Sequence, residues 1–209
     1  IPANSKTLNL TAIFYRAALL LIHGVNCSLR MVLKLFTMAT QDISKSHIDK
    51  FWDDEFKTLN YIREPFNDAV SLARWTTQGY TGPFTGVMCD MRQPQPSWND
   101  KFIKFFTDRG WHNIGTSYYR MDTGVILPVH EDLYVKYIDL FKLYGQEFWI
   151  RRAIVFLEDW ASGHYFEING EPFLNWRAGD FVEWRYDAPH MAANIGLTPR
   201  YTLQITGHI

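Results

Sequence analysis

This sequence of 209 residues contains little cysteine, no long apolar run and no large excess of charge of either sign. The only cysteines are Cys27 and Cys89, which excludes a disulfide framework and a CxxC metal motif and fits a reducing compartment, so we expect a cytoplasmic location. A formal net charge of −1 disfavours nucleic acid as the main partner. We also expect no membrane span, because runs such as residues 17–22 are too short to cross a bilayer.

Acidic residues are absent from the first 37 positions, and the first acid is Asp42. A basic, acid-poor stretch of this kind is one form of targeting segment. However, the chain begins with Ile1, and Met38-Ala39-Thr40 has the look of a natural start. We therefore interpret residues 1–37 as a weakly ordered or non-native extension and predict a single domain over residues 38–209.

Apolar residues make up 47% of the chain and aromatic residues 16%, which is ample for a large hydrophobic core and argues against disorder. In the first half, apolar residues at three- and four-residue spacing predict a helix that begins at Ser46. A second helix is predicted behind a Ser97 cap and ends at Gly110. Between the two, residues 70–75 could form a strand.

The second half has the pattern of many short strands. Eight segments are rich in β-branched or aromatic residues and are mostly separated by turn signals, with one possible helix at residues 133–143. The predicted strands are 114–121, 125–130, 153–158, 164–168, 172–176, 181–186, 190–195 and 201–205. This pattern predicts a mainly β sandwich or barrel that N-terminal α-helices precede.

Two histidines and one aspartate in this half have the pattern of a metal site. His130 and Asp132 stand at the end of a predicted strand, where residues i and i+2 project to the same side. His190 opens a later strand directly after Pro189 and supplies a third ligand. Two imidazoles and one carboxylate leave open octahedral positions, an arrangement that suits non-haem Fe(II).

Other residues invite the same interpretation with less support. His47 and Asp49 repeat the spacing, but they lie on the predicted first helix, where positions i and i+2 diverge by about 200°. His164 has a phenylalanine at its i+2 position and so lacks a second ligand on its face. Arg151-Arg152 reads as a solvated pair at the start of a strand, and a grip on an acidic substrate is the alternative.

A cation follows the third histidine by ten residues. In a strand that begins at Arg200, the residues Arg200, Thr202, Gln204 and Thr206 share one polar face, which contacts either solvent or a wet cavity. A guanidinium followed at i+2 by a hydroxyl is well suited to bind a terminal carboxylate, because it donates two parallel hydrogen bonds and the hydroxyl adds a third.

The set His130-x-Asp132, His190 and Arg200-x-Thr202 resembles the signature of the Fe(II)/2-oxoglutarate-dependent dioxygenase superfamily. The resemblance covers about residues 111–207 and implies a double-stranded β-helix, which is a jelly-roll or cupin-like barrel, behind N-terminal helices.

Residues 179–184 and the Pro189-His190 step are also similar to the strand pair before the distal histidine in aspartyl/asparaginyl and prolyl hydroxylase-like members. The carboxylate at Asp132 departs from the aspartyl/asparaginyl hydroxylases, which lack it. Their substrate therefore cannot be transferred to this chain.

The resemblance implies a role for each residue. His130, Asp132 and His190 would bind Fe(II), while Arg200, Thr202 and Tyr119 would hold the distal carboxylate of 2-oxoglutarate. Tyr118 is nearly as good a candidate as Tyr119, and Asn194 could hold substrate or order water. The implied reaction consumes 2-oxoglutarate and O2, releases succinate and CO2, and hydroxylates an amino acid, a peptidyl side chain or a small metabolite.

Two alternatives remain at this stage. A metal-binding cupin that uses no keto acid would not need Arg200. A non-catalytic β-barrel binding protein would take up no iron at all, and changes at His130 and Asp132 would leave its metal content unaltered.

Overall fold

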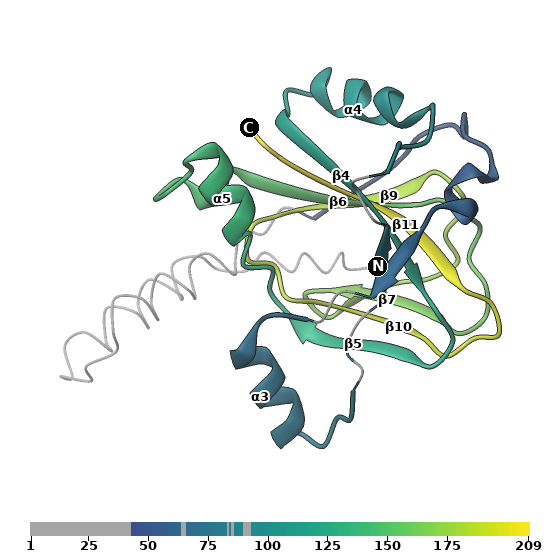
Figure 1. Cartoon of the computed structure of the whole chain (residues 1–209), viewed down its shortest axis with the longest axis vertical. Helices are drawn as coiled ribbons and strands as arrows, with labels where there is room; N and C mark the ends of the chain where they lie inside the picture. The colour runs from purple at the N-terminus through teal and green to yellow at the C-terminus, as the bar shows by residue number, and fades with distance from the viewer. Residues whose placement is uncertain (1–42, 64–65, 83, 85, 90–92) are drawn as a thin grey trace, which may run out of the picture. The chain divides into compact units, whose positions relative to one another are not determined.

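Two antiparallel β-sheets form the body of the protein, as Figure 1 shows. The structure is a computed structural model, and it describes residues 43–63, 66–82, 84, 86–89 and 93–209. The extension predicted at residues 1–37 lies outside the described residues. Within the described residues, the mainly β fold with few helices confirms the predicted fold class.

The strands of each sheet come from distant parts of the chain. The larger sheet has the order β1, β9, β6, β11, β4, β3, β2, with the bounds Ser44–His47, Asp180–Arg185, Ile150–Phe156, Arg200–His208, His112–Met121, Val87–Cys89 and Tyr61–Arg63. The smaller sheet has the order β5, β10, β7, β8, with the bounds Val125–His130, His190–Asn194, His164–Ile168 and Glu171–Phe173. Strands β5 and β7 match their predicted bounds, whereas β6 begins three residues earlier than predicted.

Helix α4 (Asn99–Thr107) covers the outer face of the larger sheet (Figure 1). Phe102 and Phe106 are one helical turn apart and fully buried, and Phe106 packs on Phe181 of β9 with ring centroids 5.5 Å apart. Burial of each ring stabilises the fold by about 1.5–3 kcal/mol. The predicted Ser97 cap is wrong, because the N-cap residue is Trp98 and Ser97 hydrogen-bonds Glu55 instead.

The predicted strand at residues 70–75 is wrong, because this segment is helix α3 (Ala69–Thr77). Asp68 caps the helix by accepting a hydrogen bond from the backbone N–H of Val70 at 3.0 Å. Ser71 and Trp75, one turn apart, are its buried residues, while Val70 is exposed. The Asp68 cap and the burial of residues one helical turn apart therefore favour a helix, and they outweigh the strand preference of the β-branched Val70.

The predicted helix from Ser46 is also wrong. Residues Ser44–His47 form the edge strand β1 along β9, and the only helical turn nearby is the 3-10 helix η1 (Asp54–Thr58). Ile48, Trp52 and Phe56 are buried at the predicted four-residue spacing. They reach the core from a mostly irregular chain, because pairing with β9 holds the start of the segment extended.

The remaining helical segments are short. Helix α5 (Val135–Phe141) lies within the predicted range 133–143, and the 3-10 helix η2 (Glu147–Trp149) follows it. Neither these nor the other helices of the described residues reach the length and apolar character of a membrane-crossing helix.

Two turns touch at the end of the small sheet, before β7 and after β10. Gly163 has a φ of +91°, and a Cβ at that position would lie 2.3 Å from the backbone nitrogen of Gly196. We expect Gly163→Ala to lower the free energy of unfolding by about 2 kcal/mol or more, because strain and overpacking add. This loss corresponds to a decrease in Tm of about 4–8 °C, measurable by circular dichroism.

Gly170→Ala is the matched control. Gly170 has a similar φ of +78°, but no atom lies within 4 Å of the added Cβ. It should therefore show only the smaller backbone cost. Equal losses in the two variants would mean that the contact between the turns contributes nothing.

Candidate metal and carboxylate site

Strand pairing brings His130 and His190 side by side. His130 ends β5 and His190 opens β10, and the two are direct partners in the antiparallel register. Their ring centroids are 4.3 Å apart, and both side chains are buried. The two histidines, sixty residues apart in the sequence, thus project from one end of the small sheet.

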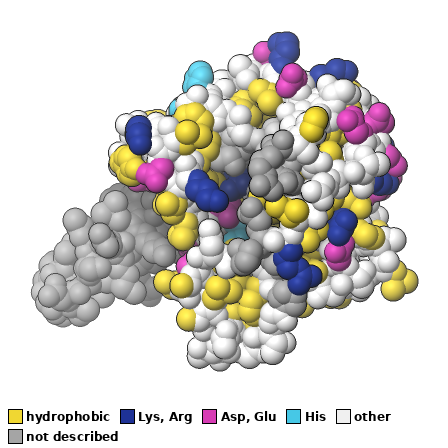
Figure 2. Space-filling model, viewed as in Figure 1, with side chains coloured by type: hydrophobic (Ala, Val, Ile, Leu, Met, Phe, Trp, Pro, Cys, Tyr) yellow, Lys and Arg dark blue, Asp and Glu magenta, His cyan; other side chains and the backbone are white. Residues whose placement is uncertain are grey.

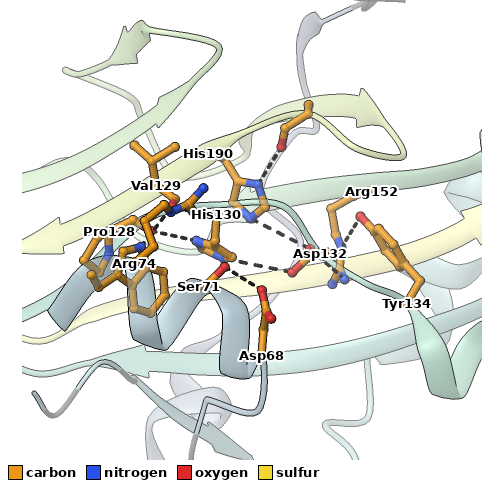
Figure 3. A network of polar contacts seen from close by, with 12 residues as sticks. Asp68, Ser71, Arg74, Pro128, Val129, His130, Asp132, Tyr134, Arg152 and His190 are labelled. Atoms are coloured by element: carbon orange, nitrogen blue, oxygen red, sulfur yellow. Dashed lines mark hydrogen bonds and ion pairs between the residues drawn. The ribbon is translucent and has the colours of Figure 1, made fainter. Parts of the chain in front are cut away.

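Both imidazoles are held in the same orientation by a backbone carbonyl. Nδ1 of His130 donates to the carbonyl oxygen of Pro128 at 2.8 Å, and Nδ1 of His190 donates to that of Ala188 at 2.9 Å. Each Nε2 therefore carries the lone pair and faces Asp132 (Figure 3). Burial, with a contribution from His190, lowers the pKa of His130 to about 4, so its imidazole is neutral at pH 7.

Asp132 lies in the loop directly after β5 and completes the group. Its carboxylate oxygens are 4.0 Å from Nε2 of His130 and 3.8 Å from Nε2 of His190. Among the described residues, these three form the only cluster of histidine, cysteine and acidic side chains close enough to share a metal ion, with all donor atoms within 4.8 Å of one another.

Arg152 of β6 approaches Asp132 from the large sheet. Its Nη2 is 3.0 Å from Oδ2 of Asp132, and its Nε donates to the hydroxyl of Tyr134 at 3.3 Å (Figure 3). Burial of Asp132 opposes ionisation, but Arg152 and the two histidines outweigh it and lower the pKa to about 2. The contact is an ion pair without hydrogen-bond alignment, so the buried Oδ2 has no hydrogen-bond partner among the described residues.

Aromatic side chains enclose the two histidines. Helix α3 is fixed to β5 because Trp75 Nε1 and an Arg74 Nη atom both donate to the carbonyl of Val129. The ring of Trp75 meets His130 edge-on at 5.9 Å, and that of Trp184 lies 5.2 Å from His190. An apolar wall of this kind limits water around the imidazoles and supports the neutral form of His130.

The polar face predicted for the last strand faces the interior between the sheets. Thr202, Gln204 and Thr206 of β11 pair with Phe156, Ile154 and Arg152 of β6, and directly opposed residues share a face. Phe156 contacts Phe166 of the small sheet with ring centroids 6.0 Å apart. This inner face is therefore the one that looks toward the two histidines.

Arg200 is the first residue of β11 and precedes Thr202 on the inner face, on the side of the barrel where β10 ends. It is 6% exposed, and its Nη1 donates to the carbonyl of Tyr165 at 2.6 Å. Its Nε has no partner, and no carboxylate of the described residues pairs with it. Burial lowers the pKa of Arg200 to about 10, so the guanidinium is still charged at pH 7. His164 is nearby and also has a buried unpartnered nitrogen, Nδ1.

Strand register separates the two candidate tyrosines. Tyr119 is directly opposite Thr202 and therefore belongs to the inner face. Tyr118 points to the other side, where it is fully buried and its hydroxyl donates to Asn99 of α4 at 2.7 Å.

Asn194 holds the turn after β10. Its Nδ2 donates to the carbonyls of Met121 and Thr198, both at 2.8 Å, and its Oδ1 accepts from the backbone N–H of Gly196 at 3.0 Å. Both amide protons are used within the chain, so the geometry favours a structural role over the substrate role suggested by the sequence.

Arg152 is the site residue that sequence reasoning placed wrongly. Its side chain is only 11% exposed and forms an ion pair with Asp132, so it is not a solvated surface cation. The predicted strand began at residue 153, which left Arg152 outside it. A strand that begins at Ile150 places Arg152 on the same face as Ile154 and Phe156. The two-residue alternation with these apolar residues could have indicated that Arg152 faces the interior.

Figure 2 shows a hollow in the middle of the face that it draws, where a histidine, an acidic side chain and basic side chains lie close together. A different pocket of about 400 Å³ lies near β1 and β8 and is lined by residues such as His47, Trp176 and Asp180. None of the candidate ligands lines that second pocket.

No protein-family model and no curated protein sequence matches the chain. Among solved structures, a prolyl-4-hydroxylase from Pseudomonas putida is similar with a TM-score of 0.51 and 14% identity, over 83% of this chain and 96% of that one.

Two further structures are similar at lower scores. A 2OG-Fe(II) oxygenase family protein from Burkholderia pseudomallei has a TM-score of 0.37 and 14% identity over 68% of this chain and 80% of that one. A cupin protein from Bacteroides fragilis has a TM-score of 0.34 and 14% identity over 62% and 80%. The two facing antiparallel sheets and the likeness to the prolyl-4-hydroxylase agree on the fold, which is a double-stranded β-helix.

Proposed function

We propose that this protein is an Fe(II)- and 2-oxoglutarate-dependent oxygenase that hydroxylates a C–H bond of its substrate. The observation that carries the proposal is the pair of unsatisfied polar groups on opposite sides of one interior. Among the described residues, the buried Oδ2 of Asp132 has an ion pair with Arg152 but no hydrogen bond, the Asp132 carboxylate faces the Nε2 atoms of both histidines, and Arg200 is a buried cation without an anion. Buried polar groups are normally partnered, so each points to a missing ligand.

The residues at the first position fit iron. Two neutral imidazoles and one ionised carboxylate are the donor set that divalent iron takes in oxygenases, and three coordination positions stay open. The carbonyls of Pro128 and Ala188 fix which nitrogen of each ring is the donor. The imidazole of His130 is neutral and Asp132 is ionised at pH 7, and these are the states of the two side chains that bind a metal ion.

The residues at the second position fit a carboxylate. Arg200 keeps Nε and Nη2 available, and the hydroxyl of Thr202 lies two residues further along the same inner face. A carboxylate there would receive charge-assisted hydrogen bonds and compensate the buried cation. 2-Oxoglutarate has such a carboxylate at one end and a metal-chelating keto acid at the other, so it suits both positions.

When bound, iron and 2-oxoglutarate supply the oxidising power, and the balanced reaction consumes one O2 and yields succinate, CO2 and the hydroxylated product. The chain's own contribution is to hold and orient. Arg200 would fix the co-substrate, Asp132 and the histidines would fix its reactive end, and Trp75 and Trp184 would limit water around the histidines.

The direct test is succinate formation. Purified protein with Fe(II), 2-oxoglutarate and O2 should release succinate even without the true substrate, while the same mixture without O2 should release none. Isothermal titration under anaerobic conditions should show that 2-oxoglutarate binds the metal-loaded protein more tightly than the metal-free protein. Metal binding without any binding of 2-oxoglutarate would favour a cupin enzyme that needs no keto acid, and would contradict our proposal.

A further inference from the structure

The interior contains a second arginine that the co-substrate does not need. Arg152 and Arg200 stand near opposite ends of the inner face, because Arg152 is paired with Thr206 of β11, six residues beyond Arg200. Arg152 lies beside Asp132 (Figure 3), so it is close to the position of the metal, whereas Arg200 enters the interior from the other end of β11.

The ion pair with Asp132 does not use all of Arg152. The guanidinium has five N–H donors, of which one faces Asp132 and one binds Tyr134. Its Nη1 has no partner among the described residues. The Arg152 side chain is 11% exposed, so the guanidinium is not fully enclosed by the protein.

Beside Arg152, a strip of hydroxyl and amide groups is also unused. Ser117 of β4 is directly opposite Gln204 of β11, and Thr206 is the next residue along that face. All three are half-buried, and within the described chain their side chains make no hydrogen bond. Half-buried polar groups that bind nothing in the chain are suited to bind a ligand.

Charge points to the kind of ligand. The ion-paired charges beside the candidate metal ligands are Arg152 and Asp132, which balance each other. A divalent iron and the keto-acid carboxylate of 2-oxoglutarate would add two positive charges and one negative charge there, so one net positive charge remains at this end of the interior. A group of opposite charge beside Arg152 would compensate it, and an uncompensated interior charge is costly.

We infer that Arg152, together with Ser117, Gln204 and Thr206, binds the primary substrate, and that this substrate is a small molecule with a carboxylate group. The inference rests on the proposed function for the identity of the reaction. Arg152 would hold the carboxylate near Asp132, while the amide and hydroxyl groups would receive the polar remainder. The bond to be oxidised would then lie between this anchor and the metal.

The experiment measures binding without turnover. The protein is loaded with Zn(II) in place of Fe(II) and saturated with 2-oxoglutarate. Ligand-observed NMR then compares small carboxylic acids, including the L-amino acids and their N-acetyl forms, with the carboxamide of each. We expect at least one acid to bind about tenfold or more tightly than its carboxamide, as the loss of a charge-assisted bond would require.

Arg152→Gln should remove this preference, and Arg152→Lys should retain part of it because it keeps the charge but not the planar fork. Arg151→Gln, on the other face of β6, is the matched control and should behave as the wild type. The inference is overturned if no carboxylic acid binds, if acids and carboxamides bind equally, or if Arg152→Gln keeps the preference. A role limited to orienting Asp132 would instead lower Zn(II) affinity and leave the preference intact.

Arg200→Met separates this inference from the proposed function. That variant should lose 2-oxoglutarate binding while the acid-over-carboxamide preference persists. If the wild type fails to bind 2-oxoglutarate, the proposed function is wrong, and the dependence of carboxylate binding on Arg152 is still read from the Zn(II)-loaded protein.

Discussion

Arg200→Met should abolish 2-oxoglutarate binding while leaving the fold as stable as the wild type or more stable. The affinity should fall by about 100-fold or more, since hydrogen bonds to charged groups contribute about 1.5–3 kcal/mol each and at least two are lost. Stability should hold because the variant removes a buried cation whose only described partner is the carbonyl of Tyr165. Replacement of buried charges by apolar side chains is often neutral or stabilising, by about 1–4 kcal/mol.

Titration calorimetry with 2-oxoglutarate and thermal unfolding followed by circular dichroism measure both halves of this result. Thr202→Val provides a graded comparison, because it removes one hydroxyl and should weaken binding by about tenfold. If Arg200 had only a structural role, the results of both measurements would be the opposite. The variant would then unfold at a lower temperature, and the wild type would show no 2-oxoglutarate binding to lose.

Asp132→Asn should remove metal binding and with it succinate formation. The substitution keeps the shape of the side chain but removes the charge that faces both histidines. Loss of a partner outside the metal's ligands already costs about 10–100-fold in affinity, so loss of a ligand should exceed about 100-fold. The metal-free protein should also be destabilised by about 1–3 kcal/mol, because the buried Arg152 loses its anion.

The matched control for this variant is in the chain itself. His47 and Asp49 repeat the His-x-Asp spacing at the surface, with His47 Nε2 3.7 Å from a carboxylate oxygen of Asp49. Asp49→Asn should leave Zn(II) or Fe(II) affinity, measured by titration, and the Tm unchanged. If Asp49→Asn and Asp132→Asn had equal effects on metal binding, the interior site would not be the metal site.

Several features of the site could be predicted from the sequence because they depend on short spacing. The step from His130 to Asp132 and the step from Arg200 to Thr202 lie within one strand or its end, where the two-residue period decides which side chains share a face. His190 could be added because a strand pattern begins at that residue. In the structure His130, Asp132 and His190 lie close together, and Thr202 is directly opposite Phe156 on the inner face.

Other features were mispredicted because contacts between distant segments override local preference. The apolar spacing after Ser46 is typical of a helix, yet pairing of β1 with β9 holds its first residues extended. Residues 70–75 contain a β-branched residue, but the Asp68 cap and contacts of Arg74 and Trp75 with Val129 favour a helix against β5.

The sequence by itself determined the mainly β class, the set of candidate ligands and the polar face of the last strand, since each follows from periodicity or spacing along the chain. Only the tertiary structure decided that this face looks inward, that Tyr119 and not Tyr118 belongs to it, and that Arg152 stands against Asp132. The physical reason is register: the residue opposite a given position depends on which strands pair and in what alignment, and burial of an arginine depends on an acid twenty positions away in the chain.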